Sequence, residues 1–386
     1  MIDFLSESLD IYRWMRAIRE DIHAHPETGN EEYRTTDVIL KCLKELNLET
    51  YRPLPTGVIG VLHGGKPGSV CAFRADIDAL PVTEETGLSC ASVNTGVMHA
   101  CGHDMHTAAL LGTARILSMH KEELQGSVVF IFQPDEEGDG GAKRILDTGI
   151  LDEPGVKAVY GAHIEPSLPA GTIGVKYGSF YANAATIDIT VHGHGGHAAE
   201  PEKCTDSLYA CARLCAELKK LTKEEDGRRS VCTIGSFHAG NVRNIISDRA
   251  ECHGILRCSD IALRETQKQE IVEICQRVEA QEHVTADLVL KDGYPGVFNH
   301  DEDVRLVQET AEALLGKDHV VQEPASMTTE DFGFFLEKYE GCYYHIGVDS
   351  AYPLHNARMN PKEEALGYAA AVHSAVVWNW LERHAL

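Results

Sequence analysis

The sequence lacks several features that would assign it to a specialised class of protein. Aromatic residues make up 7% of its 386 residues and charged residues 24%, which is the composition of an ordinary globular protein. Its apolar runs fall short of the roughly 20 residues that cross a bilayer. The opening stretch MIDFLSESLDIYRWMRAIRED carries acids throughout, unlike the basic and then unbroken apolar regions of a secretory signal. We therefore expect a cytoplasmic protein without a membrane role.

Basic residues and paired cysteine motifs are also scarce. The 35 lysines and arginines stand against 59 acids, which gives a net charge of −24. Such a surface repels nucleic acid and anionic membranes, so neither is an expected partner, and a solubilising role explains the acid excess best. The twelve cysteines contain no CxxC pair. This favours reduced thiols, most of them small core residues, over disulfides.

The length and the hydrophobic pattern predict two domains. An opening helix should end before Pro26, and a second runs from about Tyr33 to Leu46. Apolar runs then alternate with helical patterns, which is typical of an α/β domain with a largely parallel sheet. We expect strands at 58–62, 70–74, 128–132 and 156–162, with helices at 107–119 and 141–148.

A different order of elements begins near Ala182. It reads strand 185–192, helix 206–221, strands 231–237 and 249–256, helix 261–279 and strand 284–290. This β-α-β-β-α-β order is ferredoxin-like. A helix at 303–315, a strand at 342–347 and a helix at 363–381 then resume the earlier character. We therefore expect a discontinuous α/β domain, residues 1–181 and 293–386, interrupted by an inserted ferredoxin-like α+β domain, residues 182–292.

The densest group of reactive side chains is HACGHDMH, residues 99–106, with five potential metal ligands. Imidazole and thiolate suit zinc and similar borderline metals, and Gly102 allows the backbone to bend so that donors converge. The alternative is a polar helix cap. In either case Asp104 is a capping residue or a partner of the ligands.

Acids gather in QPDEEG, residues 133–138, directly after the strand 128–132. Ligand and catalytic groups of open α/β sheets collect beyond the carboxyl ends of strands. Because adjacent acids on extended backbone point apart, one of Glu136 and Glu137 can bind metal while the other transfers protons. A solvated acidic turn is the alternative. His163 at another strand end and His355 in a late loop say little alone, but all four sites can face one crevice.

Taken in order, these motifs resemble a known family. HACGHDMH, QPDEE, GHGGHAAEP, NIISD, TTEDF and PLHNARMNPKEEAL are similar to the metallo-amidohydrolases that include hippurate hydrolases, N-acyl-L-amino acid amidohydrolases and auxin-conjugate (indole-acetyl-amino acid) hydrolases. These belong to the aminoacylase/carboxypeptidase superfamily of co-catalytic two-metal peptidases. The resemblance extends from Arg19 to the end. It implies a metal-binding catalytic domain, a lid and dimerisation role for the insertion, and a homodimer or higher homo-oligomer.

Carried onto matching positions, the resemblance also implies a set of site residues. The implied metal ligands are Cys101, His103, Glu137, His163 and His355, with Cys101 between two divalent ions. Zinc or manganese is expected, with cobalt or nickel as alternatives. Glu136 becomes the proton shuttle, and Asp76 of RADIDALP supports the site from outside the ligand set.

The implied reaction is hydrolysis of the amide of an N-acylated amino acid. A pair of divalent ions lowers the pKa of water from 15.7 towards about 7, which makes hydroxide available at neutral pH. Glu136 takes the proton and later gives it to the leaving nitrogen. His197 of the insertion stabilises the oxyanion, and Asn244 helps to hold the substrate. Arg257, with Arg243 as a competitor, is the candidate for pairing with the substrate carboxylate.

Three other functions fit parts of the pattern. A dipeptidase or carboxypeptidase would use the same metals, a cysteine hydrolase would use Cys101 as its nucleophile, and a binding protein would have lost catalysis. The GxSxG and HExxH motifs are absent, which argues against serine hydrolases and helical zinc proteases. Glu202, Ser247 and Asp135 depart from common family residues, so the preferred acyl group and amino acid are left open.

Overall fold

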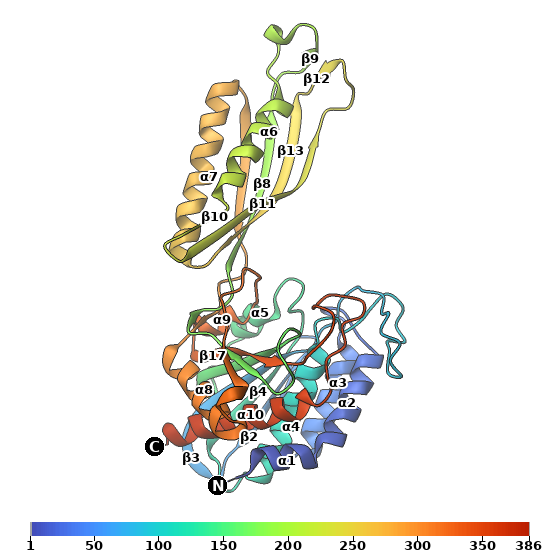
Figure 1. Ribbon diagram of the computed structural model, residues 1–386, viewed down its shortest axis with the longest axis vertical. Helices are drawn as coiled ribbons and strands as arrows, with labels where there is room; N and C mark the ends of the chain where they lie inside the picture. Colours follow the sequence, from blue (N-terminus) through green and yellow to red (C-terminus); the bar gives the residue numbers. More distant parts are fainter. Residues whose placement is uncertain (1, 386) are drawn as a thin grey trace. The chain divides into compact units, whose positions relative to one another are not determined.

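The computed structural model describes residues 2–385, which form two compact units (Figure 1). Within the described residues, unit 1 comprises 2–178, Phe298–Pro324 and 334–385, and unit 2 comprises Ser179–Val297 and Ala325–Gly333. The expected insertion, residues 182–292, falls inside unit 2. The short segment 325–333, which the sequence pattern assigns to the discontinuous domain, groups with unit 2 instead.

Unit 1 is built on a mixed sheet of eight strands. Their order is β1 (Glu49–Tyr51), β2 (Val58–His63), β4 (Gln125–Gln133), β3 (Lys66–Asp76), β5 (Val156–Glu165), β17 (Glu340–Gly347), β6 (Ile173–Val175) and β16 (Val320–Gln322). The four central strands, β4, β3, β5 and β17, run parallel. Their carboxyl ends therefore lie at one edge, where Asp76 pairs with Gln133 and His163 pairs with His345.

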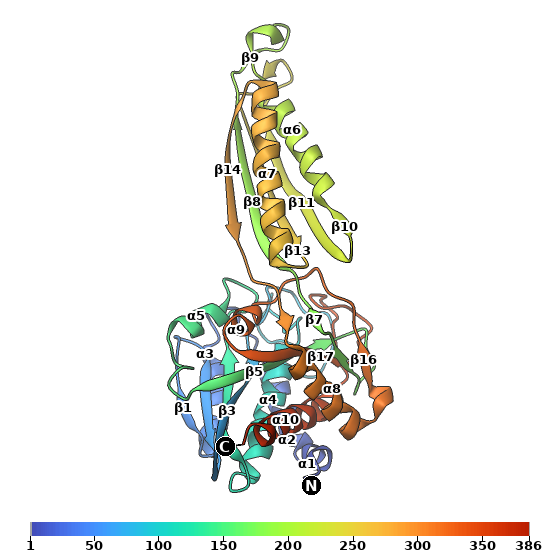
Figure 2. The ribbon, with the colours of Figure 1, turned by 90° about the vertical axis from the view of Figure 1, so that its left-hand side faces the viewer.

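Helices cover this sheet. They are α1 (Phe4–Asp10), α2 (Tyr12–Ala24), α3 (Tyr33–Glu45), α4 (His103–Met119), α5 (Gly141–Asp147), α8 (Asp301–Leu315), α9 (Gly333–Leu336) and α10 (Ala365–Arg383). Helix α3 packs against α4, α4 against α10 and α10 against α8, while α4 and α10 both contact β3 (Figure 2). The α/β fold with a mixed, largely parallel sheet flanked by helices is thus as predicted.

Burial explains why these segments form strands and helices. The runs VIGVL of β2 and VVFIF of β4 are wholly buried, as expected of strands covered on both faces. Helix α4 is buried along most of its length, and small residues permit the close packing. A Cβ on Gly112 would lie 2.1 Å from Met15 Sδ, so α2 can approach α4 only because this position is glycine.

The opening helix differs from the prediction. The chain breaks at Ile11, where φ is −95° and ψ is 2°, so α1 and α2 replace one continuous helix. Helix α1 packs mainly against α10, and α2 packs mainly against α4. Because both apolar faces are buried in this way, tertiary packing sets the break and the helical periodicity of the sequence gives no sign of it.

Unit 2 has the predicted β-α-β-β-α-β order with one short additional strand, β10, between the first helix and the second predicted strand. Its elements are β8 (Asn183–His192), α6 (Ser207–Leu218), β10 (Lys223–Glu225), β11 (Arg228–Ala239), β13 (Arg249–Cys258), α7 (Ile261–Glu282) and β14 (Thr285–Asp292). The strands form an antiparallel sheet in the order β10-β11-β13-β8-β14. Helices α6 and α7 pack against it over an apolar core.

Short elements complete the two units. Strands β9 (Gly196–His197) and β12 (Ile245–Ile246) pair in one two-stranded ladder, and β7 (Gly178–Ser179) and β15 (Phe298–Asn299) pair in another. Single 3-10 turns occupy Pro201–Lys203, Lys219–Leu221 and Lys317–His319. Within residues 2–385, none of the helices combines the length and apolarity that a membrane crossing requires.

Candidate metal centre

The site begins where α4 begins. Gly102 precedes the helix with φ at +85°, a left-handed conformation that favours glycine. A Cβ at this position would lie 2.2 Å from Ile164 Cδ1. The turn thus places Cys101 and His103 on either side of a residue that has no side chain, beside the end of β5. Both flanking side chains are buried.

His103 is held in the orientation of a metal ligand. Its Nδ1 lies 3.2 Å from Asp78 Oδ1, and its Nε2 is buried without a hydrogen-bond partner among the described residues. A carboxylate on one ring nitrogen fixes the ring and leaves the other nitrogen to bind a cation. The carboxylate oxygen Oδ2 of Asp76 lies 3.8 Å from Nε2.

Cys101 and His163 form the second part of the site. Cys101 Sγ lies 3.3 Å from His163 Nε2. His163 Nδ1 is 2.7 Å from the carbonyl oxygen of Ile164, so it donates there and Nε2 keeps its lone pair. Burial, reinforced by His106, lowers the pKa of His163 well below its ordinary value. The ring is therefore neutral, as metal binding requires.

Glu137 and His355 form the third part. Their Oε1 and Nε2 atoms are 3.0 Å apart. The backbone N–H of His355 donates to the carbonyl oxygen of Ala100 at 2.8 Å, which ties this loop to the segment before α4. The backbone N–H of Glu137 donates to Asp78 Oδ2 at 3.0 Å. Asp78 thus orients His103 and the backbone of Glu137 together.

The five predicted ligands lie together in overlapping triplets. Cys101, His103 and His163 form one, Cys101, Glu137 and His355 a second, and His103, Glu136 and Glu137 a third, each with its donor atoms within 4.8 Å of one another. Four segments far apart in sequence supply these donors. Thiolate, imidazole and carboxylate together suit a borderline divalent cation, and the buried lone Nε2 of His103 points to one.

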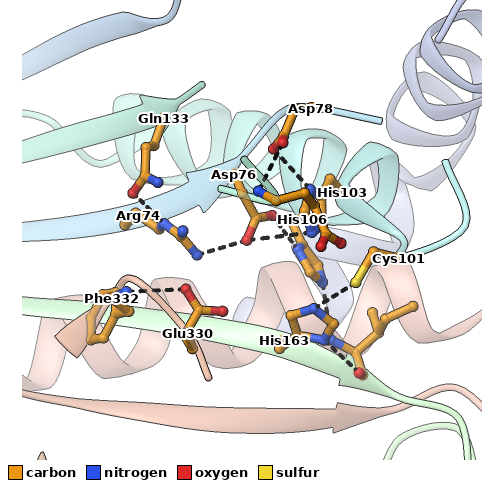
Figure 3. A network of polar contacts seen from close by, with 12 residues as sticks. Arg74, Asp76, Asp78, Cys101, His103, His106, Gln133, His163, Glu330 and Phe332 are labelled. Atoms are coloured by element: carbon orange, nitrogen blue, oxygen red, sulfur yellow. Dashed lines mark hydrogen bonds and ion pairs between the residues drawn. The ribbon is translucent and has the colours of Figure 1, made fainter. Parts of the chain in front are cut away.

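His106 lies beside this group, but both of its ring nitrogens already have hydrogen-bond partners within the protein. Its Nδ1 is 2.5 Å from Asp76 Oδ1, and its Nε2 accepts from the backbone N–H of Ile164 at 3.0 Å. Asp76 also accepts from Arg74 Nη1 at 2.6 Å. Figure 3 shows this chain of contacts beside His103 and Cys101. Asp76 therefore supports the site in two ways. It orients His106, and its negative charge raises the pKa of His103.

The buried carboxylates of the site favour the binding of positive charge, and in the absence of a metal ion they favour protons on Cys101 and His103. Burial raises the pKa of the Cys101 thiol well above its ordinary value, and Glu137 and Glu136 raise it further. Burial opposes a charged His103, but Asp76 and Asp78 outweigh it and raise the pKa of His103 to about 10. A divalent cation would replace these protons, because a coordinating thiol is deprotonated outright.

Asp104 faces away from the ligands, into a second buried network. It accepts from Arg19 Nε at 2.8 Å and lies 2.9 Å from His23 Nδ1. His23 Nε2 is 3.2 Å from Glu84 Oε1. This network joins α2 to the first turn of α4. Neither Arg19 nor His23 stands out in the sequence, where both fall within an amphipathic helix.

The remaining predicted site residues lie in unit 2. Strands β9 and β12 bring His197 close to Asn244: His197 pairs with Ile245, and the backbone N–H of Ala198 donates to the carbonyl oxygen of Asn244 at 3.1 Å. Arg257 is not near them. It lies eight residues along β13 from Arg249, which pairs with His192, so about 26 Å of strand separates the two ends.

Comparison with known protein families identifies the family of this chain. Residues 72–379 match the family described as Peptidase family M20/M25/M40. The chain belongs to peptidase family M20/M25/M40. This confirms the superfamily that the motifs indicate, and the matched stretch includes each of the five predicted metal ligands.

Named relatives of this M20-family chain act on N-acetylated amino acids. It is 35% identical over 353 residues to the N-acetyl-L-cysteine deacetylase of Bacillus subtilis, covering 90% of this chain and 84% of that protein. It is 34% identical over 365 residues to the N-acetyldiaminopimelate deacetylase of Streptococcus uberis, covering 92% and 95%.

A solved structure of similar length supports the fold. The Bacillus subtilis YXEP protein, described as a dinuclear metal binding peptidase from the M20 family, has a TM-score of 0.87 and 33% identity, covering 97% of this chain and 99% of that one. This likeness extends over both units, so the predicted resemblance to two-metal amidohydrolases and peptidases is confirmed at the level of family and fold.

Proposed function

We propose that this chain hydrolyses the amide bond of N-acylated amino acids with the help of two divalent metal ions. The observation that carries the proposal is the meeting of Cys101, His103, Glu137, His163 and His355 in overlapping triplets. The names of the two sequence relatives, both deacetylases of N-acetylated amino acids, support the substrate class.

The residues fit the metals, and each has a separate task. His103 offers a buried Nε2, His163 a neutral Nε2, and Glu137 and His355 a carboxylate and a partly exposed imidazole. Cys101, like His103 and Glu137, belongs to two of these triplets, and the family resemblance implies that it is the ligand shared by both ions. When bound, the ions would lower the pKa of water and polarise the amide carbonyl. Zinc or manganese is the expected metal.

Glu136 transfers the proton in this proposal. Its carboxylate lies within 4.8 Å of the donor atoms of His103 and Glu137, on a largely buried side chain. It takes a proton from the attacking water and delivers it to the leaving nitrogen, acting first as base and then as acid. Both transfers are needed, because an amine leaves an amide only after it is protonated.

Unit 2 supplies substrate-contacting groups in this proposal. His197 donates to the oxyanion of the tetrahedral intermediate, and Asn244, which β9 and β12 hold beside it, positions the substrate. Arg257 lies about 26 Å of strand away from that pair, so one N-acylated amino acid cannot contact both, and the pairing of Arg257 with the substrate carboxylate is not retained. The lid and dimerisation role of unit 2, the homodimer and the cytoplasmic location are likewise proposed from the family resemblance.

The cysteine hydrolase is the weaker alternative. A nucleophilic cysteine needs a depressed pKa, whereas burial and two glutamates raise the pKa of Cys101. His106, one of its two candidate bases, already uses both ring nitrogens. His103, the other, has its pKa raised to about 10 by Asp76 and Asp78 although burial opposes this, so in the metal-free site it already carries the proton that a base would have to accept.

A substrate panel tests the proposal. Purified protein would be assayed on N-acetyl amino acids, hippurate and dipeptides, before and after exhaustive chelation and after zinc or manganese is restored. We expect turnover of the acylated amino acids to disappear with the metals and return with them, and dipeptides to be poor substrates. A strong preference for dipeptides would instead favour the peptidase. Turnover that survives chelation and is abolished by a thiol alkylator would favour the cysteine hydrolase.

A further inference from the structure

Cysteine is concentrated in unit 2, whereas the proposed metal ligands all belong to unit 1. Seven of the chain's twelve free cysteines fall within Ser179–Val297. They are Cys204, Cys211, Cys215, Cys232, Cys252, Cys258 and Cys275. Five of them are core residues of this unit, packed with aliphatic side chains. Buried cysteines commonly act as small apolar residues. This packing role explains the cysteines that contact aliphatic side chains only.

Three of these thiols differ from the rest because they converge. Cys211 and Cys215 are one helical turn apart on α6, so they share a face. Cys252 lies on the buried face of β13, the strand against which α6 packs. Their three Sγ atoms lie within 4.8 Å of one another. Cys211 and Cys252 are fully buried, while Cys215 is partly exposed.

We propose that Cys211, Cys215 and Cys252 form a binding site for one soft monovalent cation, Cu(I), held by three thiolates. Soft thiolate ligands select Cu(I) and zinc, and a closed zinc site takes four ligands in a tetrahedron. A site with three sulfur ligands and no fourth ligand suits Cu(I) better than zinc. With metal–sulfur bonds of about 2.3 Å, the three sulfurs would lie about 4 Å apart, so the observed spacing needs little closure.

Binding of the cation would release the protons of the thiols that become ligands, because a thiol binds metal as a thiolate.

The consequence for unit 2 is a cross-link between a helix and the sheet. A bound cation would join α6 to β13 and raise the melting temperature of the unit, since a ligand that binds the folded state stabilises it. None of the three cysteines belongs to the proposed amidohydrolase site. The inference is therefore independent of the proposed function, and either can fail without the other.

Competition for Cu(I) tests the site. The full-length protein, with its metal centre loaded with zinc so that Cys101 is occupied, would be titrated anaerobically with Cu(I) against bicinchoninate. We expect one tightly bound equivalent. Cys252→Ser should weaken binding by more than about 100-fold, beyond what loss of an outer partner of a ligand costs. Cys258→Ser is the matched control, because Cys258 is also fully buried on the same face of β13.

A second measurement does not depend on the variants. X-ray absorption at the copper edge of the wild-type protein should show a shell of three sulfurs without nitrogen, and it decides the question if Cys252→Ser does not fold. Equal Cu(I) binding by Cys252→Ser and wild type would overturn the proposal. So would a copper shell that contains nitrogen, or a disulfide within the cluster in protein prepared anaerobically together with no Cu(I) uptake.

Discussion

At the scale of single residues, the two adjacent glutamates have different surroundings. Glu137 is 3.0 Å from His355 Nε2, and His355 and His103 lower its pKa although burial opposes this. It is thus prepared to act as an anionic ligand. Glu136 directly precedes Glu137 in the chain, and its carboxylate lies within 4.8 Å of the donor atoms of His103 and Glu137. Its proposed role is to transfer protons. Its replacement should therefore abolish turnover without loss of metal, unlike replacement of a ligand.

Replacing Glu136 with glutamine tests that role. We expect Glu136→Gln to keep its metal and to lose turnover by about 10²- to 10⁴-fold, the usual contribution of general acid–base catalysis. Elemental analysis and kcat measured on the same preparation check both halves. Turnover close to wild type in a fully loaded variant would refute the assignment.

Asp78 gives a second prediction, because it holds two parts of the site at once. Asp78→Asn weakens the acceptor that faces His103 Nδ1 and the N–H of Glu137. We expect a loss of about 10- to 100-fold in metal affinity, as for other partners that orient a ligand. Competition with a chelator measures it. Asp139→Asn, an exposed acid two residues from Glu137, is the control, and equal affinities in the two variants would contradict the role.

The sequence predicts the proposed ligands, which the structure brings together, but it does not predict the residues that orient them. Cys101, His103 and the three more distant donors stand in recognisable motifs, so the resemblance could assign them. Asp78, Arg19 and His23 act through contacts that span 25 to 85 residues of chain. No local pattern marks such contacts. Arg257 is the opposite case. Its place at the end of a strand suggests a binding role, but the sequence does not show that it lies far from His197.

At the scale of elements, the buried network between α2 and α4 fixes the helix that carries His103. Burial opposes charge on His23, but Asp104 and then Glu84 raise the pKa of His23 from 6.5 to about 9. A pKa raised on folding means that the protonated histidine stabilises the native state. That contribution is complete below about pH 6.5 and is lost as the pH rises through 9.

Because the pKa of His23 is raised in the folded protein, the stability of the protein should decrease as the pH rises. The free energy of unfolding of metal-free protein should fall by a few kcal/mol between pH 6.5 and 9.5 because of His23, in proportion to the change in its pKa. Urea titrations at several pH values measure it as the difference between wild type and His23→Gln. The exposed His63→Gln is the control. A parallel pH dependence in wild type and His23→Gln would show that His23 carries no such linkage.

Most elements of the fold are predictable, and the exceptions have physical reasons. The apolar runs of β2 and β4 and the long helices α7 and α10 appear where the sequence places them. Helix α4 starts at His103 rather than at Thr107, because Gly102 provides the left-handed turn before it. Strands of three residues, such as β1 and β16, are too short to show a periodicity.

At the scale of the whole molecule, the proposed chemistry draws on both compact units. The proposed metal ligands all belong to unit 1, and His197 and Asn244 belong to unit 2. His197 is exposed on the short strand β9, and its Nδ1 accepts from the backbone N–H of Ala199 at 3.1 Å. The proton then resides on Nε2, so a neutral His197 presents an N–H donor to whatever approaches it.

The last prediction uses this donor. An oxyanion forms only after attack on the amide, so a group that binds it stabilises the transition state more than the substrate. We expect His197→Ala to lower kcat by about 10²- to 10³-fold, with little change in KM and unchanged metal content. His194→Ala removes another exposed histidine from the same loop and should leave kcat near wild type. If both variants lose activity equally, the loop matters only as a structure, and the oxyanion donor must be sought among other residues.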